Sequence, residues 1–520
     1  MIKALLKFLV IVVVFAAAAI VILRLVFPLP SLDGRQESTA LPASPDTTLG
    51  AALLPAIARH EGVSGVVPLL DGRDAFAARA VLARAAEESI DAQYYIWQTD
   101  TTGLILLDEL RAAAERGVRV RLLVDDNGIP GLDRQLAALN ALPTMEVRLF
   151  NPFTLRDPKL LSYAFDFPRL NHRMHNKSFT VDGVATILGG RNIGDIYFAY
   201  GDGVHYFDVD ALAVGPAAVD VEAEFDAYWA SGSAYPAEDI LAPAPDGLAL
   251  LTGAAAEARA SEGAKAYIEA VARSTLMHEF ETGSTKLEWV PVTVVSDDPA
   301  KGLGEAPVSD LLIGKLHELL ARPQGGVDLV SAYFVPGEEG TDLLGGLAED
   351  GVAVRVLTNA QESTDVVVVH SAYARYRPEL LASGVKLYEL RADQSGPPEE
   401  EAGFTMFGPS ASSLHAKTFA IDGERIFIGS FNFDPRSAEL NTEMGVLIES
   451  PEMASGLARF MQAEVPLVAY TVKLGADGGL EWVRTEADGK ETVFDVEPDT
   501  TAFQRWVVWF LGLLPIEWML

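Results

Sequence analysis

The sequence predicts an α/β protein made of two similar halves, preceded by a membrane-spanning helix. Three observations support this prediction: a chain of 520 residues, an apolar N-terminal run, and a repeated pattern of strands, helices and one short motif. Hydrophobic residues make up 49% of the chain, so large buried cores are expected rather than disorder. The sequence contains no cysteine, which excludes disulfides, thiolate metal sites and a cysteine nucleophile.

Residues 1–27 form the predicted transmembrane anchor. The run from Phe8 to Leu23 is apolar without a break, and snorkelling of Lys7 and Arg24 extends it to the roughly 20 residues that a bilayer requires. A cleaved signal peptide is the alternative, although no small-x-small cleavage site closes the run. Lysines before the span favour a cytoplasmic N-terminus and an external body.

The rest of the chain divides into four expected segments. Residues 28–60 carry many Pro, Ser and Thr residues and are expected to form a linker. The two halves are placed at 61–260 and 261–475, and residues 476–520 are expected to hold a hairpin and an apolar helix. The last 18 residues contain three tryptophans, so this helix either lies on lipid or packs on the protein's own core.

A duplication is visible in the order of the predicted elements. Residues 89–126 contain a strand, a helix and a second strand, and residues 327–360 repeat this order. Strand–helix–strand spacing of this kind predicts a right-handed crossover and a parallel sheet core. The chain is therefore expected to form two α/β halves that face each other.

Each half contains one copy of a short motif. The first copy is HNKSFTVDGVATILGGRN, from His175 to Asn192, and the second is HAKTFAIDGERIFIGSFN, from His415 to Asn432. His, Lys, Asp, Gly and Asn recur at identical offsets. A lone His-x-Lys pair usually occurs by chance at the surface. Agreement along the whole motif, in equivalent places of a duplicated fold, strongly indicates a shared functional role.

The motif spacing predicts which side chains meet. Residues i and i+2 of a strand project to the same face, so His175 points with Lys177, and His415 points with Lys417. Two such clusters facing each other would place two imidazoles and two cations around one pocket.

The second part of each motif predicts a hairpin. Asp182 and Asp422 each precede a glycine between two apolar alternations, which is typical of a two-residue turn, and this structural role is favoured over a chemical one. The returning strand then brings Asn192 or Asn432 back beside the histidine and lysine of its own half.

A pocket with these groups suits a phosphodiester. Lysines and Asn amides hold the non-bridging oxygens as charge develops, while one histidine attacks phosphorus and the other protonates the leaving alcohol. The sequence shows no carboxylate–histidine spacing typical of metal ligands, so neither a metal nor a cofactor is expected. The net charge of −33 argues against a nucleic-acid partner.

Histidines used in this way need a carboxylate to orient the far ring nitrogen. Glu443 follows the second motif, and Asp208 is its counterpart in the first half, because both acids precede a strand-like run and stand at the same distance before a proline. We assign Asp208 and Glu443 as the orienting acids, with Asp210 as the alternative in the first half.

These residues resemble the phospholipase D superfamily, whose signature is HxK, four residues, D, six residues and G-G/S-x-N. The resemblance covers roughly residues 60–470. Flanking stretches are similar to the bacterial cardiolipin synthase branch with a single N-terminal span: DAQYYIW, VRVRLLVDDNG, LNHRMHNK, GGRNIGDIYF, SDDPAKG and FNFDPRSAELNTE. The resemblance implies two phospholipase D-like α/β halves with mixed sheets around one shared active site.

The resemblance also implies a reaction. A phosphatidyl group from phosphatidylglycerol would be held on one histidine and passed to the head-group alcohol of a second phospholipid, with phosphatidylethanolamine as a further candidate substrate. If the usual roles in the family apply here, His175 would attack and His415 would act as acid and then base. The two motifs by themselves do not distinguish these roles. Transfer to water, as in a phospholipase D, is the alternative function.

Two further expectations follow from the resemblance. The protein would lie in the inner membrane as a single-pass protein, with its catalytic body on the periplasmic side. Because the substrates are anionic lipids and the chain is acidic, Arg169, Arg173 and Arg191 are expected to supply local attraction beside the two motif lysines.

Overall fold

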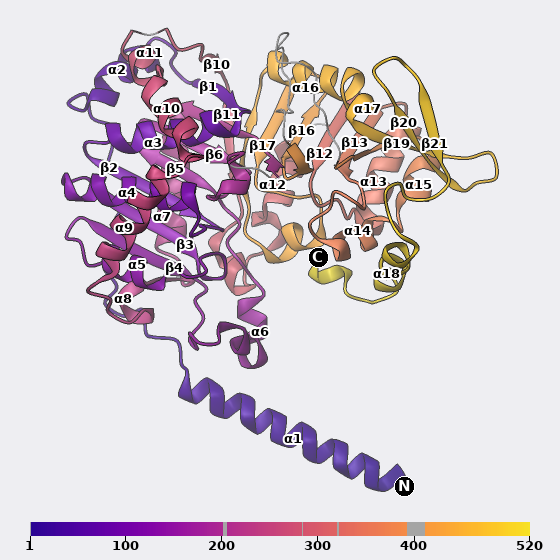
Figure 1. The fold of residues 1–520 in the computed structure, drawn as a ribbon, viewed down its shortest axis with the longest axis horizontal. Helices are drawn as coiled ribbons and strands as arrows, with labels where there is room; N and C mark the ends of the chain where they lie inside the picture. Colours follow the sequence, from indigo (N-terminus) through magenta and orange to yellow (C-terminus); the bar gives the residue numbers. More distant parts are fainter. Residues whose placement is uncertain (1, 201–204, 283, 320–321, 393–410) are drawn as a thin grey trace.

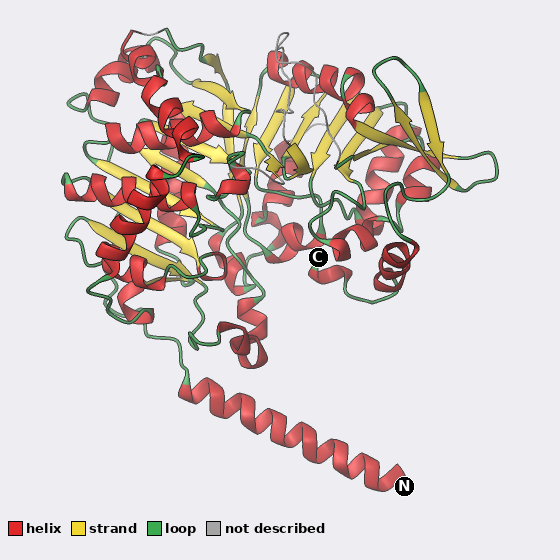
Figure 2. Cartoon of the chain, viewed as in Figure 1, coloured by secondary structure: helices red, strands yellow, loops and turns green. Residues whose placement is uncertain are grey.

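The computed structural model describes residues 2–200, 205–282, 284–319, 322–392 and 411–520. Two α/β halves lie side by side, the first drawn in indigo to magenta and the second in orange to yellow (Figure 1). The strands of the two sheets meet near the centre of the molecule, with helices mainly around the outside (Figure 2). The fold class predicted from the sequence is confirmed.

The first half contains a nine-stranded mixed sheet in the order β10-β1-β8-β6-β5-β2-β3-β4-β9. Strands β2, β3 and β4 run parallel, and the remaining pairs are antiparallel. The strands are β1 Ser64–Leu69, β2 Ser89–Tyr94, β3 Arg119–Asp125, β4 Met145–Phe150, β5 Ser178–Val181, β6 Ala185–Gly189, β8 Asp210–Val214, β9 Ala234–Pro236 and β10 Glu288–Val290. The helices are α3 Gly72–Ala85, α4 Thr101–Glu115, α5 Asp133–Leu139, α6 Tyr163–Leu170, α7 Pro216–Trp229, α8 Ala237–Ile240, α9 Gly247–Ala260, α10 Ala264–Arg273 and α11 Leu276–Thr282.

The second half contains a ten-stranded mixed sheet in the order β11-β18-β17-β16-β12-β13-β14-β19-β20-β21. Its strands are β11 Val292–Ser296, β12 Gly326–Ser331, β13 Ala353–Asn359, β14 Lys386–Leu390, β16 Lys417–Ile421, β17 Arg425–Gly429, β18 Met444–Ile448, β19 Ala469–Leu474, β20 Leu480–Thr485 and β21 Glu491–Phe494. Its helices are α12 Leu312–Leu319, α13 Gly337–Glu349, α14 Val367–Tyr373, α15 Arg377–Ala382, α16 Pro451–Ala463, α17 Val465–Val468 and α18 Ala502–Gly512.

The chain passes from the first sheet to the second at Pro291. Strand β10 closes the edge of the first sheet, and β11 opens the second. Helices α9, α10 and α11 pack on the first half, against α4, α5, α3 and the N-terminal helix α2 (Thr48–Ile57). The first sheet therefore takes its last strand from beyond the expected division at residues 260–261, and we propose Pro291 as the division. The hairpin β20–β21 extends the second sheet rather than standing apart from it.

The two halves pack face to face through one apolar cluster. Leu188 and Phe207 of the first half lie in the same buried cluster as Ala416, Ile428 and Met444 of the second. The halves are also joined by backbone pairing, because β7 (His205–Phe207) and β15 (Ala411–Leu414) form a two-stranded parallel sheet. This contact brings the two motif copies together.

The N-terminal helix α1, Ile2–Val26, stands outside the body (Figure 1). Its segment Leu5–Val26 has a mean hydropathy of 3.1 and no residue buried against the protein. Within the described parts of the chain it is the one helix long and apolar enough to cross a membrane.

The expected linker is not a free tether. Arg35 donates hydrogen bonds to the carbonyl oxygens of Ser231 (2.6 Å) and Ala234 (2.7 Å), and the Ala40 amide donates to the Asp226 carboxylate (2.8 Å). Helix α2, Thr48–Ile57, then buries Leu49 and other side chains in the first core. We call residues 28–47 the N-terminal strap. Composition predicts such a segment to be loose, but its arginine-to-carbonyl contacts fix it to the first half.

Candidate active site

Both predicted hairpins form. Strands β5 and β6 pair around the turn at Asp182-Gly183, and β16 and β17 pair around Asp422-Gly423. All four turn residues have positive φ angles, of 50°, 64°, 57° and 66°. Two successive residues in this conformation make the tight turn that matches the twist of the flanking strands.

The two motif aspartates also hold the neighbouring strand. The Asp182 carboxylate accepts hydrogen bonds from the amides of residues 87–89, just before and at the start of β2, with its shortest contact of 2.8 Å to Glu88. Asp422 accepts from the amides of residues 324–326 at the start of β12, including one of 2.6 Å to Gly325. These contacts place both aspartates at the turn ends of the hairpins, in the structural role that was favoured.

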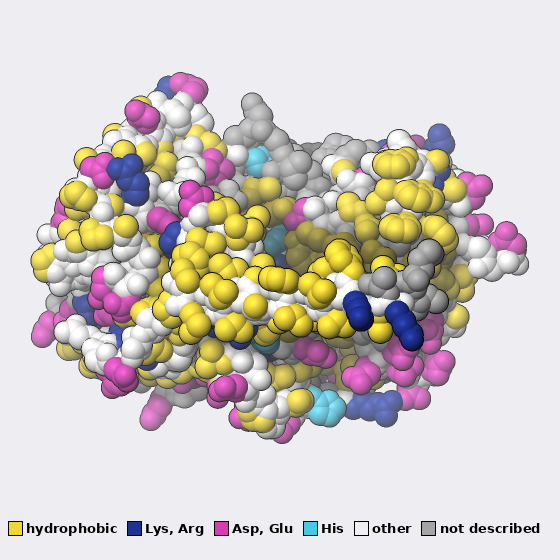
Figure 3. All heavy atoms as spheres, turned by 90° about the horizontal axis from the view of Figure 1, so that it is seen from below, with side chains coloured by type: hydrophobic (Ala, Val, Ile, Leu, Met, Phe, Trp, Pro, Cys, Tyr) yellow, Lys and Arg dark blue, Asp and Glu magenta, His cyan; other side chains and the backbone are white. Residues whose placement is uncertain are grey.

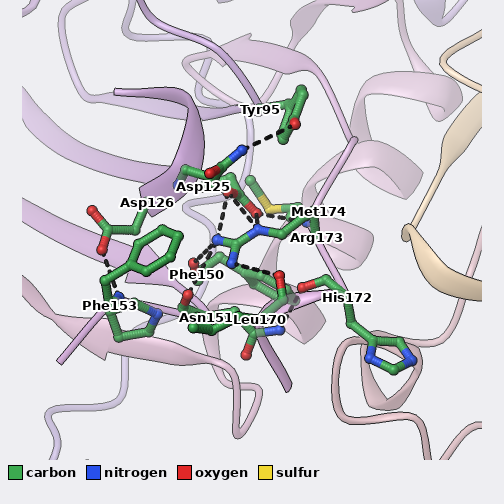
Figure 4. Close-up of polar contacts among 12 residues, drawn as sticks. Tyr95, Asp125, Asp126, Phe150, Asn151, Phe153, Leu170, His172, Arg173 and Met174 are labelled. Carbon is green, nitrogen blue, oxygen red and sulfur yellow. Dashed lines mark hydrogen bonds and ion pairs between the residues drawn. The ribbon is translucent and has the colours of Figure 1, made fainter. Parts of the chain in front are cut away.

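A buried ion pair positions the segment before His175. The Arg173 guanidinium donates to both carboxylate oxygens of Asp125 at the end of β3, and the Met174 amide donates to the same carboxylate at 2.8 Å. Figure 4 shows Arg173 at the centre of this network, which also includes backbone carbonyls of Phe150 and Asn151. The side chain of Arg173 and the backbone amide of Met174 thus both bond the Asp125 carboxylate. The backbone just before His175 is therefore fixed to the end of β3.

The second half uses a neutral residue for the same task. Asn359 ends β13 as Asp125 ends β3, and its amide side chain bonds both backbone groups of Leu414, at 2.8 Å to the amide and 2.9 Å to the carbonyl. His415 therefore follows a backbone residue fixed from the end of the equivalent strand.

Each histidine is held by the opposite half. The His175 amide donates to the carbonyl of Thr442 (2.8 Å), and Nδ1 of His175 lies 2.8 Å from the Glu443 carboxylate. The His415 amide donates to the carbonyl of Phe207 (2.8 Å), and its Nδ1 lies 2.6 Å from the Asp208 carboxylate. Both acids assigned from the sequence thus contact a histidine, and the pairs are crossed between the halves.

The alternative acid, Asp210, does not contact a histidine. Its carboxylate pairs with Arg79 (2.8 Å) and Arg191 (3.4 Å), and all three side chains are buried. In the first half the contact with a histidine is therefore made by Asp208, whereas the alternative, Asp210, faces two buried guanidinium groups.

The arginines expected to attract substrate are committed within the protein. Arg191 donates to the carbonyls of Leu69 and Leu70, besides its pair with Asp210. Arg173 is neutralised by Asp125, and Arg169 pairs with Asp166. The two motif lysines remain as the cations beside the histidines.

The Glu443 carboxylate is held by two hydroxyl groups. Ser430 donates to Oε2 at 2.5 Å, and Ser437 donates to Oε1 at 2.9 Å. The Glu443 amide donates to Asp297 at 2.7 Å, and Asp297 in turn pairs with Lys301 at 2.9 Å. The SDDPAKG stretch therefore supports the backbone of the acid that contacts His175.

The one difference between the motif copies in the G-G/S-x-N element has a steric reason. Gly190 takes the place that Ser430 takes in the second copy, and a Cβ atom at Gly190 would lie only 2.0 Å from Oδ1 of Asp208. The first half therefore needs glycine beside its aspartate, whereas the second half uses the serine hydroxyl to hold its longer glutamate.

The lysines and asparagines of both motifs are buried at the site. Lys177 donates to the carbonyl of His175 at 2.5 Å. Lys417 donates to the carbonyl of His415, and its Nζ lies 3.1 Å from Nδ1 of the His415 ring. Asn192 accepts from the Ile96 amide at 3.1 Å. Its Nδ2 and the Oδ1 of Asn432 are buried without a hydrogen-bond partner among the described residues. The hydrogen bond from Ile96 fixes the orientation of the Asn192 amide, so its Nδ2 is the end left to donate to a ligand.

Aromatic side chains that the sequence reasoning missed surround both histidines. Tyr95 packs edge-on against His175, with ring centroids 5.0 Å apart. Tyr206 stacks on His415 at 5.0 Å, and Tyr197 packs edge-on against it at 5.1 Å. The hydroxyl groups of Tyr206 and Tyr333 both donate to Asp365, at 2.8 Å. Tyr95 follows a strand of the duplicated pattern, but Tyr197 lies in a short 3-10 helix and Tyr206 in the three-residue strand β7, and both lie outside that pattern.

Burial controls the protonation of the site. Burial, followed by the charges of Lys177 and Lys417, holds the pKa of His175 well below 6.5. Burial lowers the pKa of Lys177 to about 7 and raises that of Glu443 to about 7. Asp208 differs, because the contact with His415 and nearby cations outweighs burial and lowers its pKa. His175 is therefore a neutral imidazole near neutral pH.

A cavity of about 400 Å³ opens beside the site. It is lined by Tyr95, Ile96, Gln98, Thr99, Asp100, Asn127, Gly128 and Pro130. Tyr95 both lines this cavity and packs against His175. Within the described ranges, no three His, Asp or Glu side chains gather in a group that could hold a metal ion.

Comparisons with known proteins agree with this geometry. A family model described as cardiolipin synthase, phospholipase D-like domain, matches twice, at residues 80–229 and 316–464. Cardiolipin synthase C of Escherichia coli is 44% identical over 91% of this chain and 99% of its own length. A probable cardiolipin synthase of Bacillus subtilis is 25% identical over 75% of this chain and 63% of its own.

Among solved structures, phosphatidylserine synthase of Haemophilus influenzae has a similar fold. The TM-score is 0.53, with 13% sequence identity, and the match covers 82% of this chain and 92% of that protein. At this identity the likeness concerns the fold alone.

Proposed function

The chain belongs to the cardiolipin synthase family with phospholipase D-like domains, and we propose that it is a membrane-bound phosphatidyltransferase that makes cardiolipin. The phosphatidyl donor and acceptor would be phosphatidylglycerol and a second phospholipid. The observation that supports this most directly is the pair of crossed His–carboxylate contacts, which combine two histidines in one site.

In the first step, Nε2 of His175 attacks phosphorus. Glu443 accepts a hydrogen bond at Nδ1, which keeps Nε2 unprotonated and aimed into the pocket. The P–O bond to glycerol breaks, and His415 gives its proton to the leaving oxygen. The product is a phosphatidyl-histidine and free glycerol.

In the second step, the intermediate passes to an alcohol. His415, now neutral, takes the proton from a head-group hydroxyl of a second phosphatidylglycerol, whose oxygen attacks phosphorus. The P–N bond to His175 breaks, and cardiolipin leaves. When phosphatidylethanolamine serves as donor, the same two steps release ethanolamine instead of glycerol.

Charge stabilisation in both steps would come from the motif side chains. Lys177 and Lys417 are buried beside the histidines, where the low dielectric strengthens their attraction to phosphate oxygens. Nδ2 of Asn192 is buried without a hydrogen-bond partner among the described residues and would donate to those oxygens, and the amide nitrogen of Asn432 would do the same from the second half. The cavity beside Tyr95 provides room for a glycerol head group.

The membrane setting follows from α1. A 22-residue apolar span would hold the body at the surface where its lipid substrates lie. Lys3 and Lys7 precede the span, which favours a cytoplasmic N-terminus and a periplasmic body in the inner membrane.

One assay tests the proposed function. The purified full-length protein is incubated with phosphatidylglycerol vesicles, with and without phosphatidylethanolamine, and the lipids are separated and quantified. We expect cardiolipin from the wild type and none from His175→Ala or His415→Ala. His172→Ala is the matched control, because this neighbouring histidine only bonds the carbonyl of Pro168. Phosphatidic acid as the sole product would show a hydrolase instead.

A further inference from the structure

Helix α18 carries a stripe of exposed aromatic and apolar side chains. Val508 is the buried residue of this helix, at 6% exposure, whereas Trp509 is 59% exposed. The other exposed members are Phe503, Trp506, Phe510 and Leu513. Positions 503, 506, 510 and 513 follow the helical repeat, so their side chains form one face. The rings of Phe503, Trp506 and Phe510 stack on one another along it.

This face is held rigidly away from the core. The helix begins with a capping box between Thr501 and Gln504 and packs on α14 through its other side. Beyond the helix, Arg436 bonds the carbonyls of Met519 and Leu520, at 2.7 Å and 2.6 Å. Because both ends are fixed, the exposed aromatics are not the result of a frayed terminus.

A second apolar patch lies where α1 meets the body. The Arg24 side chain donates to the carbonyl of Phe165 in α6 (2.7 Å), and Phe27 stacks on the Phe165 ring. Next to this junction Leu160 and Leu161 are exposed. Helices α1, α6 and α18 lie on the same side of the body (Figure 1). In the view from that side, the apolar side chains of α1 run across the front, and further apolar side chains lie around them among charged ones (Figure 3).

The N-terminal strap limits how the body can turn relative to α1. Arg35 bonds carbonyls of the first half within ten residues of the end of α1, and Arg121 bonds the carbonyl of Ser38 at 2.9 Å. A body joined in this way presents one face to the bilayer that α1 enters. That face includes α18.

We propose that the stripe on α18 and the patch at Leu160–Leu161 dock into the interface of the phospholipid bilayer, as a second attachment besides α1. Tryptophan favours the head-group region, because its ring is apolar and its N–H can bond water or ester oxygens. With a net charge of −33, attachment to an anionic bilayer by apolar side chains avoids the repulsion that a charge-based contact would meet. This docking keeps the shared site at the lipid surface.

The absence of cysteine from the sequence permits a direct test. Single cysteines replace Trp509, Leu161, Val13 in α1 and Ile268, each in the full-length protein, and each is labelled with an environment-sensitive fluorophore. Ile268 is on α10, at the top of Figure 1 and away from α1. The proteins are placed in phosphatidylglycerol nanodiscs with lipids that carry a quencher near the head group or deep in the chain.

We expect the labels at 509 and 161 to be quenched most by the shallow quencher, Val13 by the deep one, and Ile268 by neither. Quenching at Val13 without quenching at 509 would overturn the proposal while leaving α1 as a span. Fluorescence at 509 that depends on protein concentration rather than on lipid would identify a second copy as the occupant, and would also overturn it.

A kinetic test separates docking from folding. The triple variant Trp506→Ala, Trp509→Ala, Phe510→Ala is compared with Leu343→Ala, an exposed apolar position on α13. We expect a rise of about 5–10-fold in the apparent KM for vesicles and an unchanged kcat with short-chain lipid in detergent. Equal losses in both assays would indicate a merely structural role for α18 and contradict the proposal.

Discussion

The Nδ1 atom of His175 lies 2.8 Å from the carboxylate of Glu443, although the two residues belong to opposite halves of the molecule. The counterpart contact joins His415 to Asp208 at 2.6 Å. Each half therefore supplies one histidine and the acid for the other histidine. Neither half holds a complete set of reacting groups, so the packing between the halves is part of the active site.

The crossed contacts predict how the acid variants behave. Glu443→Gln and Asp208→Asn should each lower kcat by about 10²–10⁴-fold, because the histidine loses its orienting carboxylate. Steady-state cardiolipin synthesis measures both variants, with Glu439→Gln as the control. Activities of Glu443→Gln and Asp208→Asn close to that of the control would contradict the pairing.

The two glycine/serine positions predict unequal effects. Gly190→Ser should reduce activity by at least about 10²-fold, because its Cβ would lie 2.0 Å from the Asp208 oxygen and displace the partner of His415. Ser430→Gly removes one of two hydroxyl contacts to Glu443 and should cost about tenfold or less. Circular dichroism checks that both variants fold. Similar activities would show that the steric account is wrong.

Local features of this site could be predicted from the sequence, because they depend on short segments. The alternation of apolar residues around Asp182-Gly183 predicts the β5–β6 hairpin, and the same pattern predicts its counterpart. The positions of Asp208 and Glu443 before a strand also have a sequence signal. The sequence carries no signal for which histidine each acid contacts, because that contact depends on how the two sheets pack.

Other features arise from contacts between distant segments. Tyr206, Tyr333 and Asp365 come together from three separate parts of the chain, and aromatic residues are too common in strands to mark such a cluster. The strap is held by arginine contacts to carbonyl oxygens, which any sequence supplies. Its Pro- and Ser-rich composition therefore indicated a loose linker.

The protonation states predict a narrow pH optimum. His175 must be neutral to attack, and its pKa lies below 6.5, so activity falls at acidic pH as this imidazole gains a proton. Lys177 must be charged to bind phosphate, and its pKa is about 7, so kcat/KM should fall as the pH rises beyond that value. Lys177→Arg should move the basic limb upward, because guanidinium stays charged. A basic limb unchanged in this variant would contradict the assignment.

The motif aspartates are predicted to act on stability rather than on chemistry. Asp182→Ala leaves three amides without this acceptor, that of Ser89 buried and the other two partly buried, and should lower the free energy of unfolding by about 2–4 kcal/mol. Asp182→Asn retains one acceptor oxygen and the positive φ and should cost less. Asp422→Ala should also cost less, because its surroundings are more exposed. Thermal unfolding measures the order of the three variants, and kcat per folded molecule should stay near the wild-type value. A large drop in kcat without a loss of stability would assign Asp182 a chemical role.

The central claim is that one phosphatidyl-enzyme forms on His175 in a site that both halves build. The most direct measurement is peptide mass spectrometry of the full-length His415→Ala variant after rapid mixing with phosphatidylglycerol. This variant lacks both the acid of the first step and the base of the second, so the intermediate should form slowly but should not pass to the acceptor alcohol. The account predicts a phosphatidyl adduct on the peptide that contains His175, absent from the His175→Ala, His415→Ala double variant. Two results together would contradict the account: no adduct on His175 in the His415→Ala variant, and an adduct on His415 in the His175→Ala variant treated in the same way.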